Sequence, residues 1–519
     1  MEYKTFLDAR EIEPETKLDF DLCIVGAGAA GITIAREFLN TNLRVCVLES
    51  GGLRVDAAVN RLSEIDDVGR LPGTEGLNRL RFFGGTTNHW GGHCVPLEPD
   101  DFERQDWIAY SGWPYDYNEL RPYYIRAHGV LGLGEFDYNP ENIGSALGFE
   151  IFPFDSKVVA TTVSRYNRVR FGIKYGDELD RAKNIKVILY SDVSDIMMAD
   201  SAANNVVHVL AKSIAGNQIY VGAKHFVIAC GAIENARLLL MSNRQRHSGI
   251  GNHSDLVGRF FQEHLSYSSG YIVPNTGNPK LRFYLREWPY GDIGVRAHIA
   301  VPSDKVRELQ IPKFRSEIGL VSASSAFRLA KAIKRNVSVG DVLALISDPV
   351  GLGTIARCYS NAPPTAYLLI NHVEQTPNPD SRVTLSVKKD PLNRPQPQLN
   401  WKLSSLDQEG VIRAQRLIAH EVGRSGFGRM QIEMGEGAND FLEKAVGPGH
   451  QMGTTRMDDD PARGVTDGNA KVHYTSNLHV AGSSLFPRCG WSNPTLSIVA
   501  TSIRLADHLK MRFRAEGVL

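Results

Sequence analysis

The sequence has little of what stabilises or anchors several classes of protein. Its 519 residues include six cysteines, and no two of them form a C-x-x-C pair. So few thiols exclude a disulfide framework, and no metal site is predicted. No run of about 18 apolar residues occurs, so no membrane-spanning helix is predicted. The first 20 residues lack the apolar core of a secretory signal, and the expected location is the cytoplasm.

An excess of charge of either sign is also absent. Lysine plus arginine number 58, and aspartate plus glutamate number 58. A chain without net charge has no global attraction for a nucleic acid backbone or an anionic membrane surface. The expected partner is therefore a small molecule. A composition of 42% hydrophobic and 22% charged residues predicts a globular protein, and the length predicts more than one domain.

The first strong pattern is a strand, a glycine-rich turn, a helix and a second strand. Residues 19–25 form an apolar run, residues 26–31 read GAGAAG, residues 32–39 are helix-like, and residues 44–48 are again strand-like. This order and spacing are typical of a βαβ unit that holds a dinucleotide at the start of its helix. The pattern itself does not separate FAD from NAD.

The glycines of this turn have separate predicted roles. Gly26 allows the tight turn, Gly28 lets the backbone approach a pyrophosphate, and Gly31 lets the helix pack closely on the strand. Glu49 ends the second strand and is placed to accept hydrogen bonds from ribose hydroxyls. An acidic side chain at this position disfavours a 2′-phosphate, so NADP is not expected.

Further along the chain, strand-like segments dominate until a helix near residue 405. Short β-rich runs between residues 185 and 230 predict one sheet, and others between about 266 and 386 predict a second, mostly antiparallel sheet. Ser405 and Gln408 form a capping box at the start of a helix expected to cover the second sheet. Segment 325–356 alternates basic and apolar residues. It predicts either a helix that touches a membrane or partner, or one packed on its own sheet.

The most distinctive patterns occur toward the carboxyl end. They are GHQMGTTRM at 449–457, GVTD at 464–467, NLHV at 477–480, AGSS at 481–484 and SNPTL at 492–496, preceded by GGTTNHWGG at 84–92 and VIACGAIENARL at 227–238. With the glycine turn, these motifs span nearly the whole chain. In this order the sequence resembles the glucose-methanol-choline (GMC) oxidoreductases. Within that family it resembles the sugar-oxidising branch that includes pyranose oxidase and bacterial glycoside 3-oxidases.

The resemblance implies an FAD-dependent enzyme that oxidises the secondary hydroxyl of a sugar or glycoside to the ketone, by hydride transfer to flavin N5. His450 matches the catalytic base of the family, and a histidine suits this role because its ordinary pKa of about 6.5 lets it accept a proton near neutral pH. Asn493 matches the second member of the catalytic pair and would hydrogen-bond the substrate hydroxyl. Dioxygen, a quinone or another acceptor would then reoxidise the flavin.

The residues implied to bind FAD come from several segments. They are Gly26, Gly28, Gly31, Glu49 and Ser50 around the glycine turn, Gly85, Thr86, Asn88, His89 and Trp90 in the loop 81–97, Val193, Ala229 and Gly231 in the middle of the chain, and Gly482, Ser483, Asn493, Pro494 and Thr495 near its end. His89 matches the histidine that carries the flavin covalently in pyranose oxidase. Its neighbours differ from that enzyme, and covalent attachment stays open.

The expected fold combines α/β and α+β parts. A Rossmann-type FAD-binding domain is predicted from residues 1–270 and 445–519, and a substrate-binding domain, a mostly antiparallel sheet backed by helices, from residues 271–444. Two other functions remain open: oxidation of a steroid or other bulky alcohol, and a non-redox lyase reaction on the same fold. The aromatic and charged residues between Arg282 and Tyr290 would suit a carbohydrate.

Overall fold

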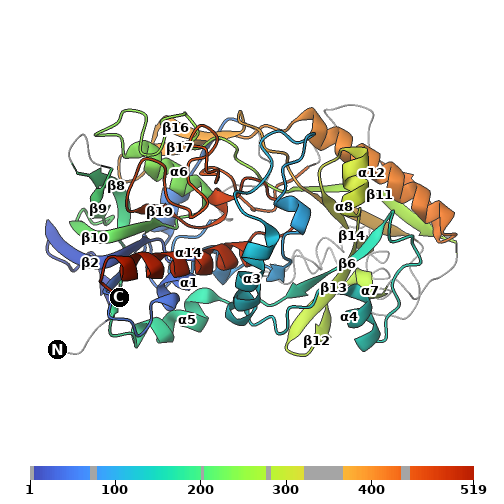
Figure 1. The fold of residues 1–519 in the computed structure, drawn as a ribbon, viewed down its shortest axis with the longest axis horizontal. Helices are drawn as coiled ribbons and strands as arrows, with labels where there is room; N and C mark the ends of the chain where they lie inside the picture. Colours follow the sequence, from blue (N-terminus) through green and yellow to red (C-terminus); the bar gives the residue numbers. More distant parts are fainter. Residues whose placement is uncertain (1–4, 70–78, 200–203, 276–281, 321–365, 434–444) are drawn as a thin grey trace, which may run out of the picture.

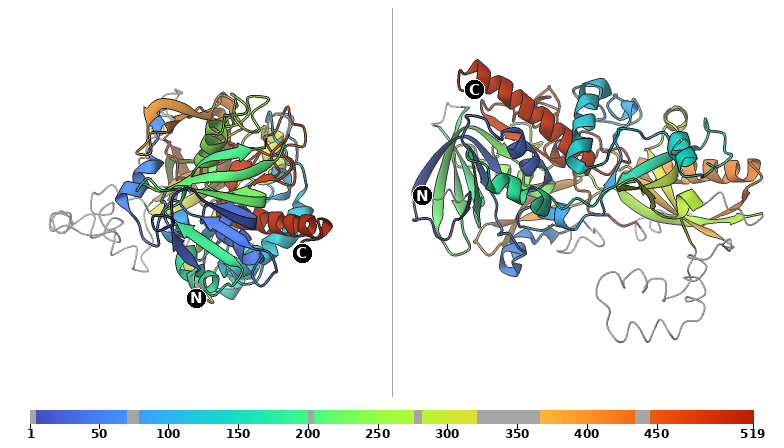
Figure 2. Two further views of the ribbon diagram at one scale, coloured as in Figure 1. Left: turned by 90° about the vertical axis from the view of Figure 1, so that its left-hand side faces the viewer. Right: turned by 90° about the horizontal axis from the view of Figure 1, so that it is seen from below.

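Two large sheets lie toward opposite ends of an elongated molecule in the computed structural model (Figures 1 and 2). The structure describes residues 5–69, 79–199, 204–275, 282–320, 366–433 and 445–519. Segment 325–356, whose role the sequence leaves open, lies outside these residues. Within the described ranges, no helix has the length and hydropathy needed to cross a membrane.

The first sheet is mainly parallel and contains the predicted βαβ unit. Its strand order is β1 (Phe6–Asp8), β7 (Ile185–Leu189), β3 (Val45–Leu48), β2 (Thr16–Val25), β10 (Gln218–Ile228), β9 (Val206–Lys212) and β8 (Asp192–Met198), with β19 (Leu478–Val480) also paired to β10. The first five strands in this order, from β1 to β10, run parallel to one another. β9 is antiparallel to β10, and β8 is antiparallel to β9. β3 is buried along its whole length, as expected for a strand covered on both faces. The Rossmann-type prediction is confirmed.

Helices α1 (Ala29–Glu37) and α14 (Thr495–Ala515) pack side by side against this sheet, and α3 (Tyr117–Leu131) lies against α14 (Figure 1). α14 buries an apolar stripe of Val499, Ile503, Ala506 and Leu509, and Phe513 contacts Phe38 edge-on at 6.2 Å between ring centroids. This spacing of three to four residues is that of an amphipathic helix. Because α14 begins at Thr495, the Asn-Pro motif before it lies directly at the helix start.

The second large sheet is antiparallel throughout. Its order is β18 (Gly428–Ile432), β11 (Leu265–Pro274), β15 (Tyr367–Val373), β14 (Phe314–Leu320), β13 (Ile293–Ala300), β6 (Ala160–Tyr166) and β5 (His93–Cys94), with β12 (Trp288–Tyr290) paired to β13. Short helices α4 (Pro140–Ala146), α7 (Arg282–Leu285) and α8 (Ser303–Leu309) lie beside it (Figure 1). The predicted antiparallel sheet backed by helices is confirmed.

The long helix α12 (Ser405–Arg424) covers this second sheet through polar as well as apolar contacts. Gln415 on α12 donates to Asn371 of β15 at 2.8 Å and accepts from Ser269 of β11 at 2.7 Å. The helix begins one residue earlier than predicted, because Ser404 and Asp407 form the capping box in place of Ser405 and Gln408. Because Ser404 and Ser405 are adjacent, the sequence is compatible with a helix that begins after either serine.

The predicted ranges 1–270 and 271–444 do not coincide with the two large sheets. β5 and β6 come from the first range but belong to the second sheet. β16 (Arg382–Lys389) was expected in the second sheet, yet it forms a small separate sheet with β17 (Pro395–Asn400), which was not predicted, and β4 (Asp66–Asp67), beside α6 (Ala232–Met241). Sequence patterns identify a strand, but its partners are set by long-range packing.

Candidate active site

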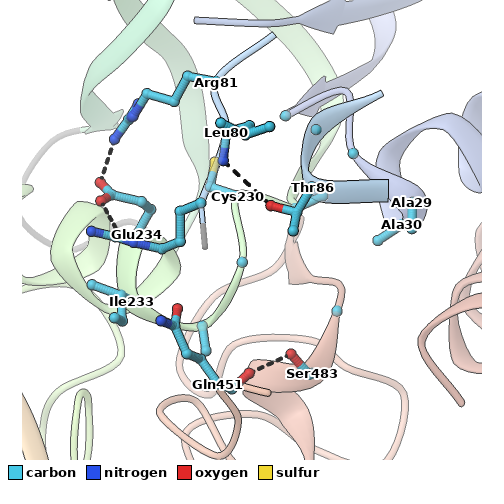
Figure 3. A pocket seen from close by; sticks show the side chains of 18 of the residues that line it. Ala29, Ala30, Leu80, Arg81, Thr86, Cys230, Ile233, Glu234, Gln451 and Ser483 are labelled. Atoms are coloured by element: carbon cyan, nitrogen blue, oxygen red, sulfur yellow. Dashed lines mark hydrogen bonds and ion pairs between the residues drawn. The ribbon is translucent and has the colours of Figure 1, made fainter. Parts of the chain in front are cut away.

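A cavity of about 490 Å³ lies at the carboxyl ends of the parallel strands of the first sheet. Its wall includes Val25 at the end of β2, Leu48 at the end of β3 and Ala229 just after β10. Ligands of open α/β sheets bind in this position, outside the carboxyl ends of the strands. Figure 3 shows part of the cavity, with Arg81 and Glu234 facing one another on one side and Gln451 and Ser483 on another.

Most of the residues predicted to bind the cofactor or to act in catalysis line this one cavity. They are Gly26, Gly28, Glu49, Ser50, Gly85, Thr86, His89, Trp90, Val193, Ala229, Gly231, His450, Gly482, Ser483, Asn493, Pro494 and Thr495. Segments that are hundreds of residues apart in the sequence therefore contribute to the same space.

Two of the predicted residues do not line the cavity. A Cβ atom added to Gly31 would lie 1.9 Å from the carbonyl oxygen of Gly26, so Gly31 serves the close packing of α1. Asn88 donates from Nδ2 to the carbonyl of Phe83 at 2.8 Å and lies against Gly84. Asn88 therefore stabilises its own loop, because a motif gives the position of a residue but not the direction of its side chain.

The glycine turn fits the pyrophosphate of a dinucleotide. Gly26 has φ +103°, and Gly28 has φ −85° with nothing within 4 Å of the place where a Cβ would stand. The backbone at Gly28 is therefore open to the cavity. α1 begins at the next residue without a side-chain cap or an acidic residue in its first turn. Its N–H groups and the positive end of its dipole favour a phosphate there.

Glu49 supports the turn as well as facing the cavity. One carboxylate oxygen accepts from the backbone N–H of Ala27 at 2.9 Å, and the other accepts from Gly51 at 2.9 Å. Burial raises the pKa of Glu49, and these two backbone hydrogen bonds oppose that shift. The oxygen that accepts from Gly51 also accepts from Oγ of Ser50 at 3.2 Å, so the lone pair left for a ribose hydroxyl is on the oxygen that accepts from Ala27. The predicted contact with ribose hydroxyls is thus compatible with a structural role that the motif did not indicate.

A cluster of buried charges lines the cavity near Glu234 and was missed by the sequence analysis. The lining residues are Arg79, Arg81, Arg237, Arg394, Asp192 and Glu234. Asp390, which does not line the cavity, pairs with Arg237 and Arg394. Burial would raise the pKa of Glu234, but all four arginines hold it well below its ordinary value. The R-x-R spacing at 79–81 was the available signal.

His450 and Asn493 meet at the wall of the same cavity. Nδ2 of Asn493 lies 3.2 Å from Nε2 of His450, although the two residues are 43 positions apart. Asn493 stands two residues before α14, and Oε1 of Glu263 accepts from the backbone N–H of His450 at 2.6 Å. The pair expected from the resemblance is thus adjacent in space.

Two further residues contact this pair and were missed. Nδ1 of His264 lies 2.9 Å from Nδ1 of His450, and Arg315 on β14 donates to Oδ1 of Asn493 at 3.4 Å. His264 is 1% exposed and immediately precedes β11. A signal for Arg315 was present, because Arg315 and Glu317 stand two residues apart in the strand-like run FRSEIGL and therefore share one face.

The segment from Arg282 to Tyr290 does not line the cavity. Phe283 and Tyr284 are fully buried in the core beside the second sheet, and Trp288 pairs with Arg286 at 3.9 Å. The suggestion that these aromatic residues stack on a carbohydrate is therefore wrong for Phe283 and Tyr284. Aromatic composition does not distinguish a binding wall from a packed core.

Comparison with known proteins agrees with this geometry. Two family models described as GMC oxidoreductase match residues 24–266 and 377–502. Paromamine 6′-oxidase of Streptomyces fradiae is 26% identical, with 94% of this chain and 90% of that protein covered. The fructose dehydrogenase large subunit of Gluconobacter japonicus is 24% identical, with 94% and 97% covered. Pyridoxine 4-oxidase from Mesorbium loti has a similar fold, with a TM-score of 0.59, 18% identity, and 95% and 99% covered.

The two matches together include both halves of the cavity, from the glycine turn to the segment that carries His450 and Asn493. The resemblance seen in the motifs is confirmed, and the cofactor of the chain is FAD. The chain belongs to the GMC oxidoreductase family and is an enzyme that acts on CH–OH groups.

Proposed function

We propose that the protein oxidises a secondary hydroxyl of a sugar or glycoside to the ketone, with His450 as the base. The observation that carries the proposal is that His450 and Asn493 contact one another in the cavity that the glycine turn also lines. When bound, FAD supplies the acceptor for the hydride that leaves the substrate carbon. Nε2 of His450 takes the hydroxyl proton, and the amide of Asn493 donates to the hydroxyl oxygen.

The residues that would hold FAD follow from the shape of the cavity. The start of α1 and the backbone at Gly28 face the pyrophosphate, and Glu49 faces the ribose. The loop around His89 and Trp90 lies toward the catalytic end, together with Pro494. These residues orient the cofactor, and the acid–base work is left to His450.

Charged side chains on the second sheet favour a polar substrate over a steroid. Glu317 on β14 pairs with Arg296 on β13 and His372 on β15, and these three side chains are each 17–19% exposed without lining the 490 Å³ cavity. Glu317 lies on the same face of β14 as Arg315, which contacts Asn493, because side chains two residues apart share a face. A steroid requires an apolar wall, whereas a sugar offers hydroxyls to charged and polar groups. The sugar-related names of the two sequence relatives also support this substrate class.

The rate of flavin reduction is expected to fall on acidification only below pH 6.5. Burial lowers the pKa of His450 well below 6.5, and His264, His372 and Arg315 lower it further. Glu263 supplies little opposing negative charge, because burial raises its pKa to about 8. A base with a lowered pKa stays neutral and active through pH 7 and is protonated as the pH falls through that lowered value. Anaerobic stopped-flow traces across the pH range measure this, and an acid limb centred above 6.5 would contradict it.

Anaerobic mixing of the flavin-loaded protein with a panel of alcohols tests the function. Sugars and glycosides are expected to bleach the flavin absorbance, whereas steroids and simple alcohols leave it unchanged. Admitting air then distinguishes an oxidase, whose colour returns rapidly, from a dehydrogenase, whose colour returns when a quinone is added. Bleaching by steroids alone would replace the proposed substrate class. Turnover of a hydroxynitrile without any bleaching would support the lyase alternative instead.

A further inference from the structure

His264 is buried against the ring of the proposed base and against the turn that leads to Asn493. Its Nδ1 is 2.9 Å from Nδ1 of His450, and its Nε2 is 2.9 Å from the carbonyl oxygen of Gly490. The two imidazole rings are nearly perpendicular, at 87°, with centroids 5.1 Å apart. Both nitrogens of His264 therefore have a partner, and each partner constrains which nitrogen carries the proton.

We propose that His264 is a positioning residue: its contact with Gly490 forces it to accept a hydrogen bond from Nδ1 of His450, which places the ring's lone pair on Nε2, where it accepts from Asn493 until it takes the substrate proton. This inference rests on the proposed function, in which His450 is the base. His264 itself touches neither the substrate nor the cofactor in this scheme. It acts by selecting one tautomer of the neighbouring ring.

The first argument starts from Gly490. A carbonyl oxygen can only accept, so Nε2 of His264 must carry the hydrogen. Burial lowers the pKa of His264 to about 4, so the ring is neutral near pH 7 and has a single N–H. Nδ1 of His264 is therefore bare and can only accept. The hydrogen shared between the two Nδ1 atoms must belong to His450.

The second argument starts from Arg315, at the other end of the site, and reaches the same tautomer. A guanidinium can only donate, so the atom of Asn493 that faces Arg315 at 3.4 Å must be its oxygen. The amide nitrogen of Asn493 then faces Nε2 of His450 at 3.2 Å as a donor. Nε2 of His450 must be the acceptor, which again places the hydrogen on Nδ1.

The opposite tautomer of His450 would break the contacts at both nitrogens. Two N–H groups would face one another between His450 and Asn493, and two lone pairs would face one another between His450 and His264. The two carboxyl groups that hold His264, His450 and Gly490 in place, those of Glu263 and Glu374, are also buried. Oε1 of Glu263 accepts from the backbone N–H of His264 at 3.1 Å and from that of His450 at 2.6 Å. Gly490 donates to Glu374 at 3.3 Å.

The same arrangement supports His450 after it has taken a proton. The proton moves from the substrate oxygen to Nε2, and the hydrogen on Nδ1 remains shared with His264. His264 stays an acceptor throughout, so no second proton transfer is needed. Because His264 precedes β11 and Arg315 lies on β14, the second sheet determines the protonation pattern of a base held beside the first.

Two amide variants of His264 separate this role from a purely structural one. In His264→Asn, Oδ1 takes the place of Nδ1 and keeps the acceptor for His450. In His264→Gln, the amide nitrogen reaches toward Gly490 in the place of Nε2, but the acceptor is lost. The rate constant of flavin reduction is expected to stay within about threefold of the wild-type value in the first variant. In the second it should fall by about 10- to 100-fold, with full flavin content and a lower-lying acid limb in the pH profile.

The outcomes distinguish a failure of this inference from a failure of the proposed function. Equal rates in the asparagine and glutamine variants, fast or slow, with an unchanged acid limb would overturn the role of His264. His450→Ala would still be slow in that case. Wild-type reduction in His450→Ala would instead overturn the proposed function. If neither His264 variant holds flavin, ¹⁵N NMR of histidine-labelled wild-type protein decides, with His450→Gln to assign the signal. A protonated Nε2 of His450 at pH 7 would overturn the inference.

Discussion

Replacing His450 with alanine is expected to lower the rate constant of flavin reduction by about 10²- to 10⁴-fold, the range that a positioned acid–base group contributes. The rate constant falls because the variant has no proton acceptor beside the reacting hydroxyl. The neighbouring imidazole is a poor replacement, because burial lowers the pKa of His264 to about 4 and its ring does not line the cavity. Anaerobic stopped-flow mixing with the substrate found in the panel measures the rate constant directly.

The alanine variant is expected to fold and to bind FAD normally. The contact between residue 450 and Glu263 uses the backbone N–H, which alanine retains. His420→Ala is a matched control, since His420 is exposed on α12 and away from the cavity. The control should reduce its flavin at the wild-type rate. Recovery of the His450→Ala rate by added imidazole would support the loss of a base, whereas a rate within threefold of the wild type would remove His450 from the mechanism.

The parts of this molecule that follow from local rules were accessible from the sequence. The glycine spacing from Gly26 to Gly31, the apolar run that became β3 and the acidic residue at 49 identify a βαβ unit, because each depends on neighbours within about 30 residues. The family resemblance then added His450 and Asn493, which the structure brings within 3.2 Å. Local spacing and motif order were sufficient for both results.

The residues that the sequence did not indicate depend on partners far away in the chain. His264 and His450 are 186 positions apart, and Arg315 and Asn493 are 178 positions apart. The assignment of β6 and β16 to their sheets has the same origin, since strand patterns do not specify which edge a strand will join. A buried polar residue inside a strand, as at Arg315, is a usable warning, because such a group requires a partner.

Alanine substitutions at Gly28 and Gly31 are expected to separate cofactor binding from stability within one turn. At Gly31 the added Cβ would stand 1.9 Å from the carbonyl oxygen of Gly26 and 3.0 Å from its carbonyl carbon. Backbone atoms cannot move aside without displacing α1 from β2. The free energy of unfolding should fall by about 1 to 3 kcal/mol or more, the range for overpacking a well-packed interior. FAD binding should fall with it, because the cradle is displaced.

Gly28→Ala is expected to leave the free energy of unfolding of the apoprotein within about 0.5 kcal/mol of the wild-type value. Its φ of −85° is accessible to alanine, and the new Cβ meets nothing within 4 Å. The methyl group would occupy the open side of the turn, where the pyrophosphate must approach the backbone. We therefore expect the affinity for FAD to fall at least about tenfold, because the loss of a single contact worth about 1.4 kcal/mol already lowers an affinity tenfold.

Thermal unfolding of the apoproteins and titration with FAD measure the two effects separately. Gly129→Ala is the matched control, because Gly129 lies exposed within α3 with nothing within 4 Å of its Cβ position. Alanine there should stabilise the helix slightly and leave FAD affinity unchanged. Normal FAD affinity in Gly28→Ala would show that the pyrophosphate does not approach this residue. An unchanged melting temperature in Gly31→Ala would show that α1 can shift outward at little cost, in which case the packing does not require glycine at this position.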